Sequence, residues 1–463
     1  MSIIPQNQDD LNLVNAIGLF ISEFRIGRLL DRCNARKEKG IPIMQIFQYK
    51  LCNVFNSMSM YMQQRTNSFR ENFSKNTYYR FLNGVKTNWQ RFTTLLSADI
   101  INKKLRDLTA EDRVNAFVID DSLHERQGYK KTELASSVFD HSDMKYKKGY
   151  RLMTLGWTDG NTFMPINSCL LASSKDENIK GTTKVFDKRS IAGKRREQAR
   201  RKGTDVMLEL LRTALSAGHS AEYVLFDSWF SNPHQIVSIK DMDLDVIAMV
   251  KKSSRIRYQF EGESLSIKQI FSRCKKRRGR SRYLLSVNVM VGKDDGENEH
   301  PIPAKIVCVR NKKNRNDWIA LICTNTDLSE EEIIRVYGKR WSIEVFFKTC
   351  KSRLNLVTEC HSLSYDALTA HVAIVFTRYM MIALEQRKNE DQRTLGELFC
   401  YFVAELSDIS FNRSLQILFD ALMESLLSVL KLTEAQISAF MNDFIGRLPD
   451  YMQKALLSEP MAA

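Results

Sequence analysis

The order of secondary structure expected between residues 113 and 250 constrains the fold of this chain more than any other feature. Three segments there combine β-branched or aromatic residues with turn-forming ends, namely RVNAFVIDDS, GYRLMTLGWTDG and TFMPINSCLLAS, and Asp159-Gly160-Asn161 predicts a turn between the last two. A basic helical segment, the apolar strand AEYVLFDS, a short helix from Asn232 and the strand LDVIAMV follow. Three antiparallel strands followed by alternating helices and strands predict a mixed α/β sheet with helices on its faces.

Changes of pattern along the chain predict four regions. The order of elements matches a ribonuclease-H-like domain, which we assign to residues 111–250 and 329–361. Strand-like segments such as RYLLSVNVMV and AKIVCVRN predict a β-rich insertion over residues 251–328. Residues 1–110 and 362–463 repeat apolar residues at helical spacing, so both ends of the chain are expected to be helical. The C-terminal helices either complete the core or also pair with a second copy of the chain.

The composition favours an anionic partner. The chain has 463 residues, 43% of them hydrophobic, and a formal charge of +15, so a large core is expected together with affinity for polyanions. Nucleic acid is the first expectation and an anionic membrane surface the second. No run approaches the roughly 20 apolar residues needed to cross a bilayer, and the N-terminus lacks the order of a secretion signal. Nine Cys without a C-x-x-C pair argue against a zinc ribbon and a disulfide framework.

A short helix is expected after Ser74, whose hydroxyl can cap it. This helix would present Lys75, Arg80 and neighbouring tyrosines, which is the type of surface that a recognition helix lays against DNA. Residues 1–110 are therefore predicted to be a DNA-binding domain. The alternative is a solvated helix face above the edge of a core.

Three acids occupy positions that suit catalysis. Asp121 ends the strand FVIDDS and Asp227 ends the strand YVLFDS, so both are expected at the rim of the sheet, where open-sheet enzymes place their chemistry. Glu344 follows on a helix predicted to begin at Ser329. Singly, such acids are usually turn residues, caps or partners in helical ion pairs. Together, three carboxylates require a neutralising cation, and their oxygens suit Mg²⁺ or Mn²⁺.

The helix around Glu344 also carries basic and aromatic residues. At about 100° per residue, Tyr337, Arg340, Glu344 and Lys351 are expected on one helical face. Glu344 would then face the metal ions, while Arg340 and Lys351 would grip DNA phosphates.

These four residues resemble the Y-x2-R-x3-E-x6-K signature of bacterial insertion-sequence transposases of the DDE class, the cut-and-paste, hairpin-forming group with a β-rich insertion. The FDSWF and IDDS segments resemble the other two blocks of that family, and the resemblance covers roughly residues 113 to 360. It implies a DNA transposase, an enzyme of metal-dependent strand cleavage and strand transfer. The implied ligands of two Mg²⁺ ions, for which Mn²⁺ would substitute, are Asp121, Asp227 and Glu344, and the implied DNA contacts are Tyr337, Arg340 and Lys351.

Two assignments within the resemblance have alternatives. Asp121 is preferred to Asp120 because the family's first acid is followed by Ser or Thr, which here is Ser122. Trp318 lies at about the place of an aromatic residue that stacks on a flipped base during hairpin formation, but a Trp at the head of an apolar strand is as often a core residue.

The resemblance implies a sequence of reactions at the ends of a mobile element. Water nicks one strand, the freed 3′-OH attacks the opposite strand to form a hairpin, a second water opens it, and the 3′-OH joins target DNA. The implied partners are double-stranded transposon-end and target DNA, bound by a homodimer in the bacterial cytoplasm at the nucleoid, without a membrane. The basic runs KRSIAGKRREQARRKG and CKKRRGRSR would grip DNA nonspecifically, or else form solvated loops.

Two other functions remain open from the sequence. A domesticated nuclease or DNA-repair resolvase would use the same acids without transposition. A non-catalytic DNA-binding regulator would use the helical N-terminus alone. No G-x-x-x-x-G-K-[ST] loop is present, which disfavours an ATP-driven motor.

Overall fold

The computed structural model describes residues 17–387, except 57–59, 67–68, 70, 110–112, 141–142, 279–280, 293–299 and 311–316, together with a few positions between 433 and 447. The chain divides into two compact units, Met1–Asp391 and Gln392–Ala463. All elements named below belong to the first unit. The helices expected beyond residue 387 lie almost entirely outside the described residues.

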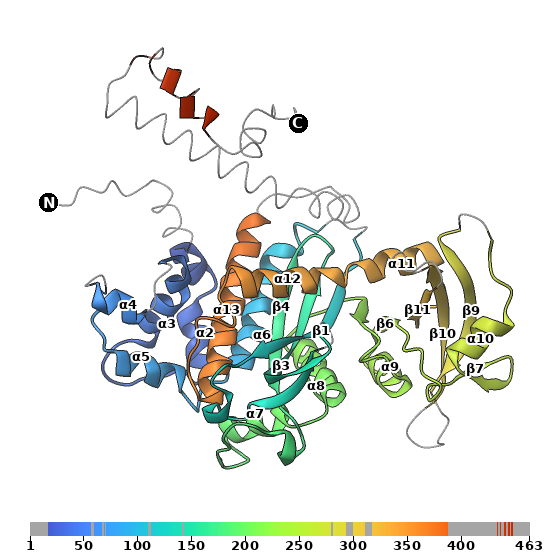
Figure 1. The fold of residues 1–463 in the computed structure, drawn as a ribbon, viewed down its shortest axis with the longest axis horizontal. Helices are drawn as coiled ribbons and strands as arrows, with labels where there is room; N and C mark the ends of the chain where they lie inside the picture. Colours follow the sequence, from blue (N-terminus) through green and yellow to red (C-terminus); the bar gives the residue numbers. More distant parts are fainter. Residues whose placement is uncertain are drawn as a thin grey trace. The chain divides into compact units, whose positions relative to one another are not determined.

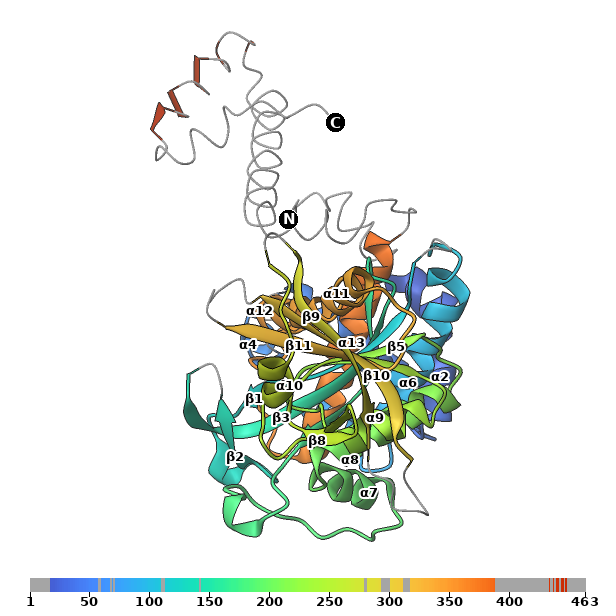
Figure 2. The same cartoon turned by 90° about the vertical axis from the view of Figure 1, so that its right-hand side faces the viewer.

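An eleven-stranded mixed sheet forms the centre of the first unit (Figures 1 and 2). Its strands lie in the order β2-β3-β1-β5-β6-β11-β10-β9-β7-β8, and β4 also pairs with β3. Strands β1, β5 and β6 are parallel, whereas β3 is antiparallel to both β1 and β4. The strand bounds are β1 Ala116–Glu125, β2 Ser136–Asp140, β3 Lys145–Thr158, β4 Phe163–Leu171, β5 Tyr223–Phe226, β6 Asp245–Met249, β7 Tyr258–Phe260, β8 Glu263–Leu265, β9 Tyr283–Val291, β10 Ile302–Arg310 and β11 Trp318–Cys323.

The mixed α/β architecture confirms the expected fold class. The three predicted strands are β1, β3 and β4, and the turn between the last two forms as expected, since Asp159 Oδ1 accepts the backbone N–H of Asn161 at 2.8 Å and that of Thr162 at 2.7 Å. Gly160 takes a φ of 96°, which suits glycine. Strand β2 was not predicted. An antiparallel β1-β3-β4 meander followed by parallel β5 and β6 is consistent with a ribonuclease-H-like domain.

The strands of the expected β-rich insertion continue the central sheet. Strand β11 pairs antiparallel with β6, with Leu321 opposite Met249, and β10 and β9 follow outward. The sheet therefore runs without interruption from the meander into residues 251–328. Whether the four predicted regions are separate domains stays a prediction.

Helices pack against the sheet, and helices from the two ends of the described chain pack against one another (Figure 1). Helix α6 packs on β4, α8 packs on β3 and β4, and α12 packs on β1. The helix bounds are α2 Ile26–Arg32, α3 Ile43–Cys52, α4 Met60–Arg65, α5 Lys75–Leu82, α6 Trp89–Ile100, α7 Ile191–Ala199, α8 Gly203–Ser216, α9 Pro233–Lys240, α10 Ile267–Arg273, α11 Glu330–Gly338, α12 Trp341–Ser352 and α13 Tyr365–Gln386.

Helix α13 corrects one expectation. Its segment Tyr365–Leu384 is long and apolar enough to cross a membrane by length and composition, although no such run was expected. Within the protein, 78% of its most apolar window is buried, and the helix packs against α3, α5, α6 and β4. Its hydrophobicity is thus accounted for by its place in the core.

A buried ionic cluster ties the N-terminal helices to α13. Glu359 forms one ion pair with Lys50 of α3, at 2.5 Å, and another with Arg378 of α13, at 2.6 Å. Although burial acts to raise the pKa of Glu359, the hydrogen bond from Arg378 and the charge of Lys50 hold that pKa well below its usual range. The N-terminal helices are therefore part of the body of the unit rather than an appended arm.

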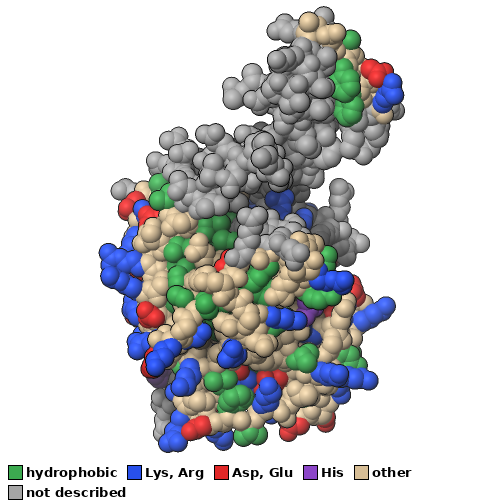
Figure 3. Space-filling view, turned by 90° about the vertical axis from the view of Figure 1, so that its left-hand side faces the viewer, with side chains coloured by type: hydrophobic (Ala, Val, Ile, Leu, Met, Phe, Trp, Pro, Cys, Tyr) green, Lys and Arg blue, Asp and Glu red, His purple; other side chains and the backbone are tan. Residues whose placement is uncertain are grey.

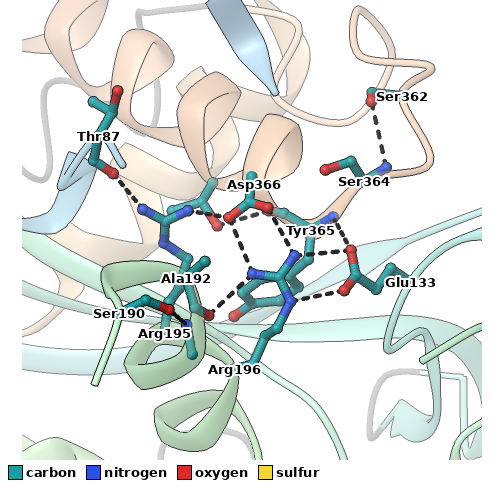
Figure 4. A network of polar contacts seen from close by, with 12 residues as sticks. Thr87, Glu133, Ser190, Ala192, Arg195, Arg196, Ser362, Ser364, Tyr365 and Asp366 are labelled. Atoms are coloured by element: carbon teal, nitrogen blue, oxygen red, sulfur yellow. Dashed lines mark hydrogen bonds and ion pairs between the residues drawn. The ribbon is translucent and has the colours of Figure 1, made fainter. Parts of the chain in front are cut away.

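Part of the basic run around α7 is structural, which corrects its expected role as a DNA grip (Figure 4). Arg196 forms ion pairs with Glu133 and Asp366, both at 2.7 Å, and Arg195 also pairs with Asp366. The side chains of Arg195 and Arg196 are only 10% and 7% exposed. Buried in this network, the two guanidinium groups join α7 to the start of α13 and to the segment before β2.

Candidate active site

The helix expected around Glu344 is interrupted. Helix α11 ends at Gly338 and α12 begins at Trp341, and the connection is made by i→i−3 hydrogen bonds such as Arg340 N–H to the Tyr337 carbonyl at 3.0 Å. Lys339, between the two helices, is buried and donates through Nζ to the backbone carbonyls of Val114 and Asp159. The backbone stays right-handed through Lys339 and Arg340, and Arg340 contacts Glu344 and lies over the ring of Tyr337, as expected for residues on one helical face. The capping of α11 by Ser329 is confirmed, since its hydroxyl accepts from Glu332 N–H at 3.3 Å.

Arg340 brings two acids together at the start of α12. Its Nη1 lies 2.8 Å from Asp120 Oδ2 and its Nη2 lies 2.5 Å from Glu344 Oε1. Helix α12 is held in place by buried Phe346, whose ring lies 4.9 Å from that of Phe163 on β4 and 4.7 Å from that of Tyr379 on α13. The position of Glu344 over β1 thus follows from aromatic packing below it.

Asp227 joins this pair through the sheet register. Parallel strands β1 and β5 place Val118 opposite Leu225, and continuing that register places Asp120 opposite Asp227. Side chains at one level of neighbouring parallel strands lie on the same face of the sheet. Burial raises the pKa of Asp120 to about 7 against the opposing charge of Arg340, and Asp227 and Asp121 raise it further. Burial also raises the pKa of Asp227, so these carboxylates resist ionising together.

Asp121 follows Asp120 on β1. Successive side chains of a strand alternate between faces, and Asp121 pairs with Arg151 of β3 rather than with Arg340. The structure therefore associates Asp120, rather than the Asp121 favoured from the sequence, with Glu344. The charge of Asp121 nevertheless acts on Asp227, so the choice of Asp121 as the first acid stays a prediction.

The donor set suits hard divalent cations. Asp120, Asp227 and Glu344 offer only carboxylate oxygens, which Mg²⁺ and Mn²⁺ prefer. Burial is the main cause of the raised pKa of Asp120, and a bound cation would relieve the repulsion from Asp227 and Asp121 that adds to it. Across the described ranges, no three His, Cys, Asp or Glu side chains are already arranged as a metal cage. Between Asp120 and Glu344 the compensating positive charge is the Arg340 guanidinium.

The other residues singled out from the sequence lie at different distances from these acids. Arg340 lies 5.9 Å over the ring of Tyr337, so Tyr337 borders the cluster. Lys351 lies further along α12, where its charge acts on the buried His124. Trp318 is stacked on Phe271, with ring centroids 4.1 Å apart, in the insertion strands.

Lys75 and Arg80 are exposed on α5 and are not brought to the acids. The expected Ser74 cap of α5 is confirmed, with Thr77 N–H donating to its hydroxyl at 3.3 Å. Figure 3 shows the side of the molecule where α4 and α5 lie, on which Lys and Arg side chains are more widespread than acidic ones.

The family of the chain follows from comparison with known proteins. Residues 56–311 match the DDE superfamily endonuclease family, over more than half of the chain. The protein belongs to the DDE superfamily endonucleases. The matched range of this endonuclease includes Asp120, Asp121 and Asp227 but ends before Glu344, so the match does not bear on the third acid. No curated protein matches the chain.

Sequence reasoning missed two residues beside the acids of this endonuclease. Trp229, two residues after Asp227, donates its backbone N–H to Asp227 Oδ1 at 2.8 Å, and Arg151 lies over its indole ring. An aromatic residue directly after a strand-ending acid was the available signal for Trp229. Arg151 carried no local signal, because its relation to Asp121 depends on the pairing of β3 with β1.

Proposed function

We propose that this DDE superfamily endonuclease is a DNA transposase that excises a mobile element and joins its 3′-OH ends to target DNA. The observation that carries the proposal is that Arg340 bridges Asp120 on β1 and Glu344 on α12, while the register of β1 and β5, continued past Leu225, sets Asp227 beside Asp120. Two Mg²⁺ ions bound by these carboxylates would activate the attacking oxygen and stabilise the leaving oxygen of a phosphodiester.

The chain's own residues are assigned as follows. Asp120, Asp227 and Glu344 hold the ions, with Asp121 as the alternative to Asp120. Arg340, placed between two of the acids, would exchange its carboxylate contacts for a DNA phosphate when the ions enter, because a guanidinium binds phosphate as it binds carboxylate.

The further DNA contacts proposed are Tyr337, Lys351, Trp318, Lys75 and Arg80. Their distribution over α11, α12, β11 and α5 would let one protomer hold DNA on both sides of the cut.

The course of the reaction is proposed from the transposase signature. Water cuts one strand, the released 3′-OH attacks the other strand to form a hairpin, and a second water opens that hairpin before joining to the target. Two ends are held by two protomers, so a DNA-bound homodimer in the bacterial cytoplasm is part of the proposal.

The test is cleavage of the DNA that borders the gene, with Mg²⁺ and a denaturing gel. Asp120→Asn, Asp227→Asn and Glu344→Gln should each bind this DNA but cut it at least about 10²-fold more slowly, because each loses charge stabilisation at the reacting phosphate. Asp121→Asn is the matched control and should keep cleavage. Cleavage lost in the Asp121 variant and retained in the Asp120 variant would reverse the assignment of the first acid.

The second candidate is a nuclease or resolvase of the same fold. The pairing of acids described above favours it equally, since cutting needs the same carboxylates. Strand transfer of the cut end into a plasmid distinguishes the two: products joined through a 3′ end support the transposase, and cut products alone support the nuclease. A non-catalytic regulator would bind the border DNA and leave it intact.

A further inference from the structure

Trp229 is an exposed aromatic side chain beside the acids. In the segment Asp227-Ser228-Trp229-Phe230, the phenyl ring of Phe230 is buried at 1% exposure, whereas Trp229 keeps 46% of its surface exposed. Its backbone N–H donates to Asp227 Oδ1 at 2.8 Å. A large indole left in solvent and tethered to an active-site carboxylate is a feature of binding surfaces rather than of packing.

Two cations flank the indole. Arg151 Cζ lies 4.8 Å and Lys251 Nζ lies 5.3 Å from the Trp229 ring centroid. The topology is consistent with the second contact: β5 and β6 are parallel neighbours, and Trp229 and Lys251 each follow the carboxyl end of one of them. The two side chains therefore lie at the carboxyl ends of these strands, where open sheets bind ligands.

The charge at this edge is only partly compensated. Arg151 shares its charge with Asp121 on β1. Lys251 is exposed and forms no ion pair with an acid in the part of the chain that the structure describes. Lys251 therefore offers a positive charge beside the indole, which suits a phosphate attached to a flat ring.

We propose that Trp229, Lys251 and Arg151 form a subsite for one unpaired nucleotide of the DNA next to the bond that is cut. The indole stacks on the base, and the two cations contact the adjoining phosphate. Base pairs within an intact duplex cover their own faces by stacking, so an unpaired nucleotide is the part of DNA that fits. The subsite rests on the proposed cleavage of DNA at Asp227, which determines that the nucleotide lies beside the reacting phosphate.

Trp318, the residue expected to stack on a base, is occupied differently. Its ring is stacked on Phe271 at an interplanar angle of 13°, and Lys252 Nζ lies 4.3 Å from its centroid. This arrangement within the insertion strands resembles packing around an aromatic pair. Trp318 is thus a useful contrast to Trp229, because both are tryptophans with a lysine over the ring.

The experiment measures DNA affinity of the full chain without divalent metal, by fluorescence anisotropy. The probes are a short labelled duplex with blunt ends and the same duplex with an unpaired thymidine tail. Trp229→Ala should weaken binding of the tailed duplex about 5- to 100-fold and that of the blunt duplex less than about threefold. Trp229→Phe should retain most of the affinity, and Lys251→Gln should lower the salt slope for the tailed probe by about 0.7.

A control separates stacking from general effects. Tyr146→Ala removes a 70% exposed aromatic residue five positions along β3 from Arg151. This variant should bind the two probes like the wild type. Equal affinities of Trp229→Ala and wild type for the tailed probe, or an equal loss on both probes, would overturn the subsite.

Failure of the subsite and failure of the proposed function give different results. If the wild type cuts border DNA and Trp229→Ala binds the tailed duplex with normal affinity, the proposed function stands and the proposed subsite is wrong. If Trp229→Ala loses affinity for the tailed duplex and the wild type does not cut border DNA, the proposed subsite stands and the proposed function is wrong.

Discussion

Two arginine-containing regions of this protein use the same side chain in opposite ways. Arg195 and Arg196 of α7 are buried and form ion pairs with Glu133 and Asp366. Arg151, beside the candidate active site, forms an ion pair with Asp121 and lies over the exposed indole of Trp229. The first region is the denser in positive charge along the sequence, yet its central arginines are neutralised. The second lies beside shorter basic segments, KYKKGYR at residues 145–151 and the pair Lys251-Lys252.

The difference lies in the acids that face each arginine. A buried guanidinium needs carboxylate partners to offset its desolvation, so the network around Arg196 keeps α7 attached to α13 and has no charge to spare for DNA. A cation at the sheet edge is solvated and can exchange partners. Local charge density therefore says little about a ligand until the partners of each cation are known.

The largest effect expected from this comparison is on stability. Glu133→Gln removes a carboxylate from the buried Arg196 network and should lower the free energy of unfolding by about 3–5 kcal/mol, because it leaves a buried guanidinium undercompensated. Denaturant unfolding followed by circular dichroism measures the change. Glu209→Gln, which breaks the exposed pair with Arg201, is the matched control and should cost at most about 1 kcal/mol. Similar losses in the two variants would contradict the contrast.

The ion pairs of Glu359 with Lys50 and Arg378 allow the stabilising effect of a buried acid to be tested through its pH dependence. Because the pKa of Glu359 is held below its ordinary value of 4.5, the stability it contributes is present above about that pH and is lost as the pH falls towards the folded pKa. Glu359→Gln should cost about 3 kcal/mol at pH 7, since it leaves Lys50 and Arg378 buried without their acid. The gap between variant and wild type should narrow in unfolding curves recorded below pH 4.5. A gap that stays constant would exclude this linkage.

The smallest stability effect is expected for the solvated part of the α7 segment. Lys188, Lys194 and Lys202 are exposed, so replacing all three with Gln should change the free energy of unfolding by less than about 0.5 kcal/mol. If they contact phosphates, the slope of log affinity for duplex DNA against log salt should fall by up to about 3. Anisotropy titrations at several salt concentrations measure it, with Lys175→Gln, an exposed lysine paired with Glu177, as control. An unchanged slope would show that the basic run does not grip DNA even where it is solvated.

Local features of the fold could be read from the sequence. The strands that became β1, β3 and β4, the turn at Gly160 and the caps Ser74 and Ser329 depend on residues close to one another along the chain. The choice between Asp121 and Asp120 is not of this kind, because it depends on which of them contacts the residues of α12 and of the segment before it.

Long-range partners explain what the sequence did not predict. The burial of Lys339 between α11 and α12 depends on the carbonyls of Val114 and Asp159, more than a hundred residues earlier. The burial of Arg196 likewise depends on Glu133 and Asp366, which no local pattern connects to α7.

The pairing of β11 with β6 has a consequence for engineering this protein. A shortened enzyme made by cutting the chain after β6 and rejoining it before α11 would strip β6 of its neighbour and leave bare backbone amides and carbonyls along that border. Such a border recruits strands from other molecules, and aggregation would follow. Keeping β11 while removing β10 would only move the bare border outward, because β11 pairs with β10 on its other side. A minimal version therefore has to retain the paired strands of residues 251–328 together, or cover the new border.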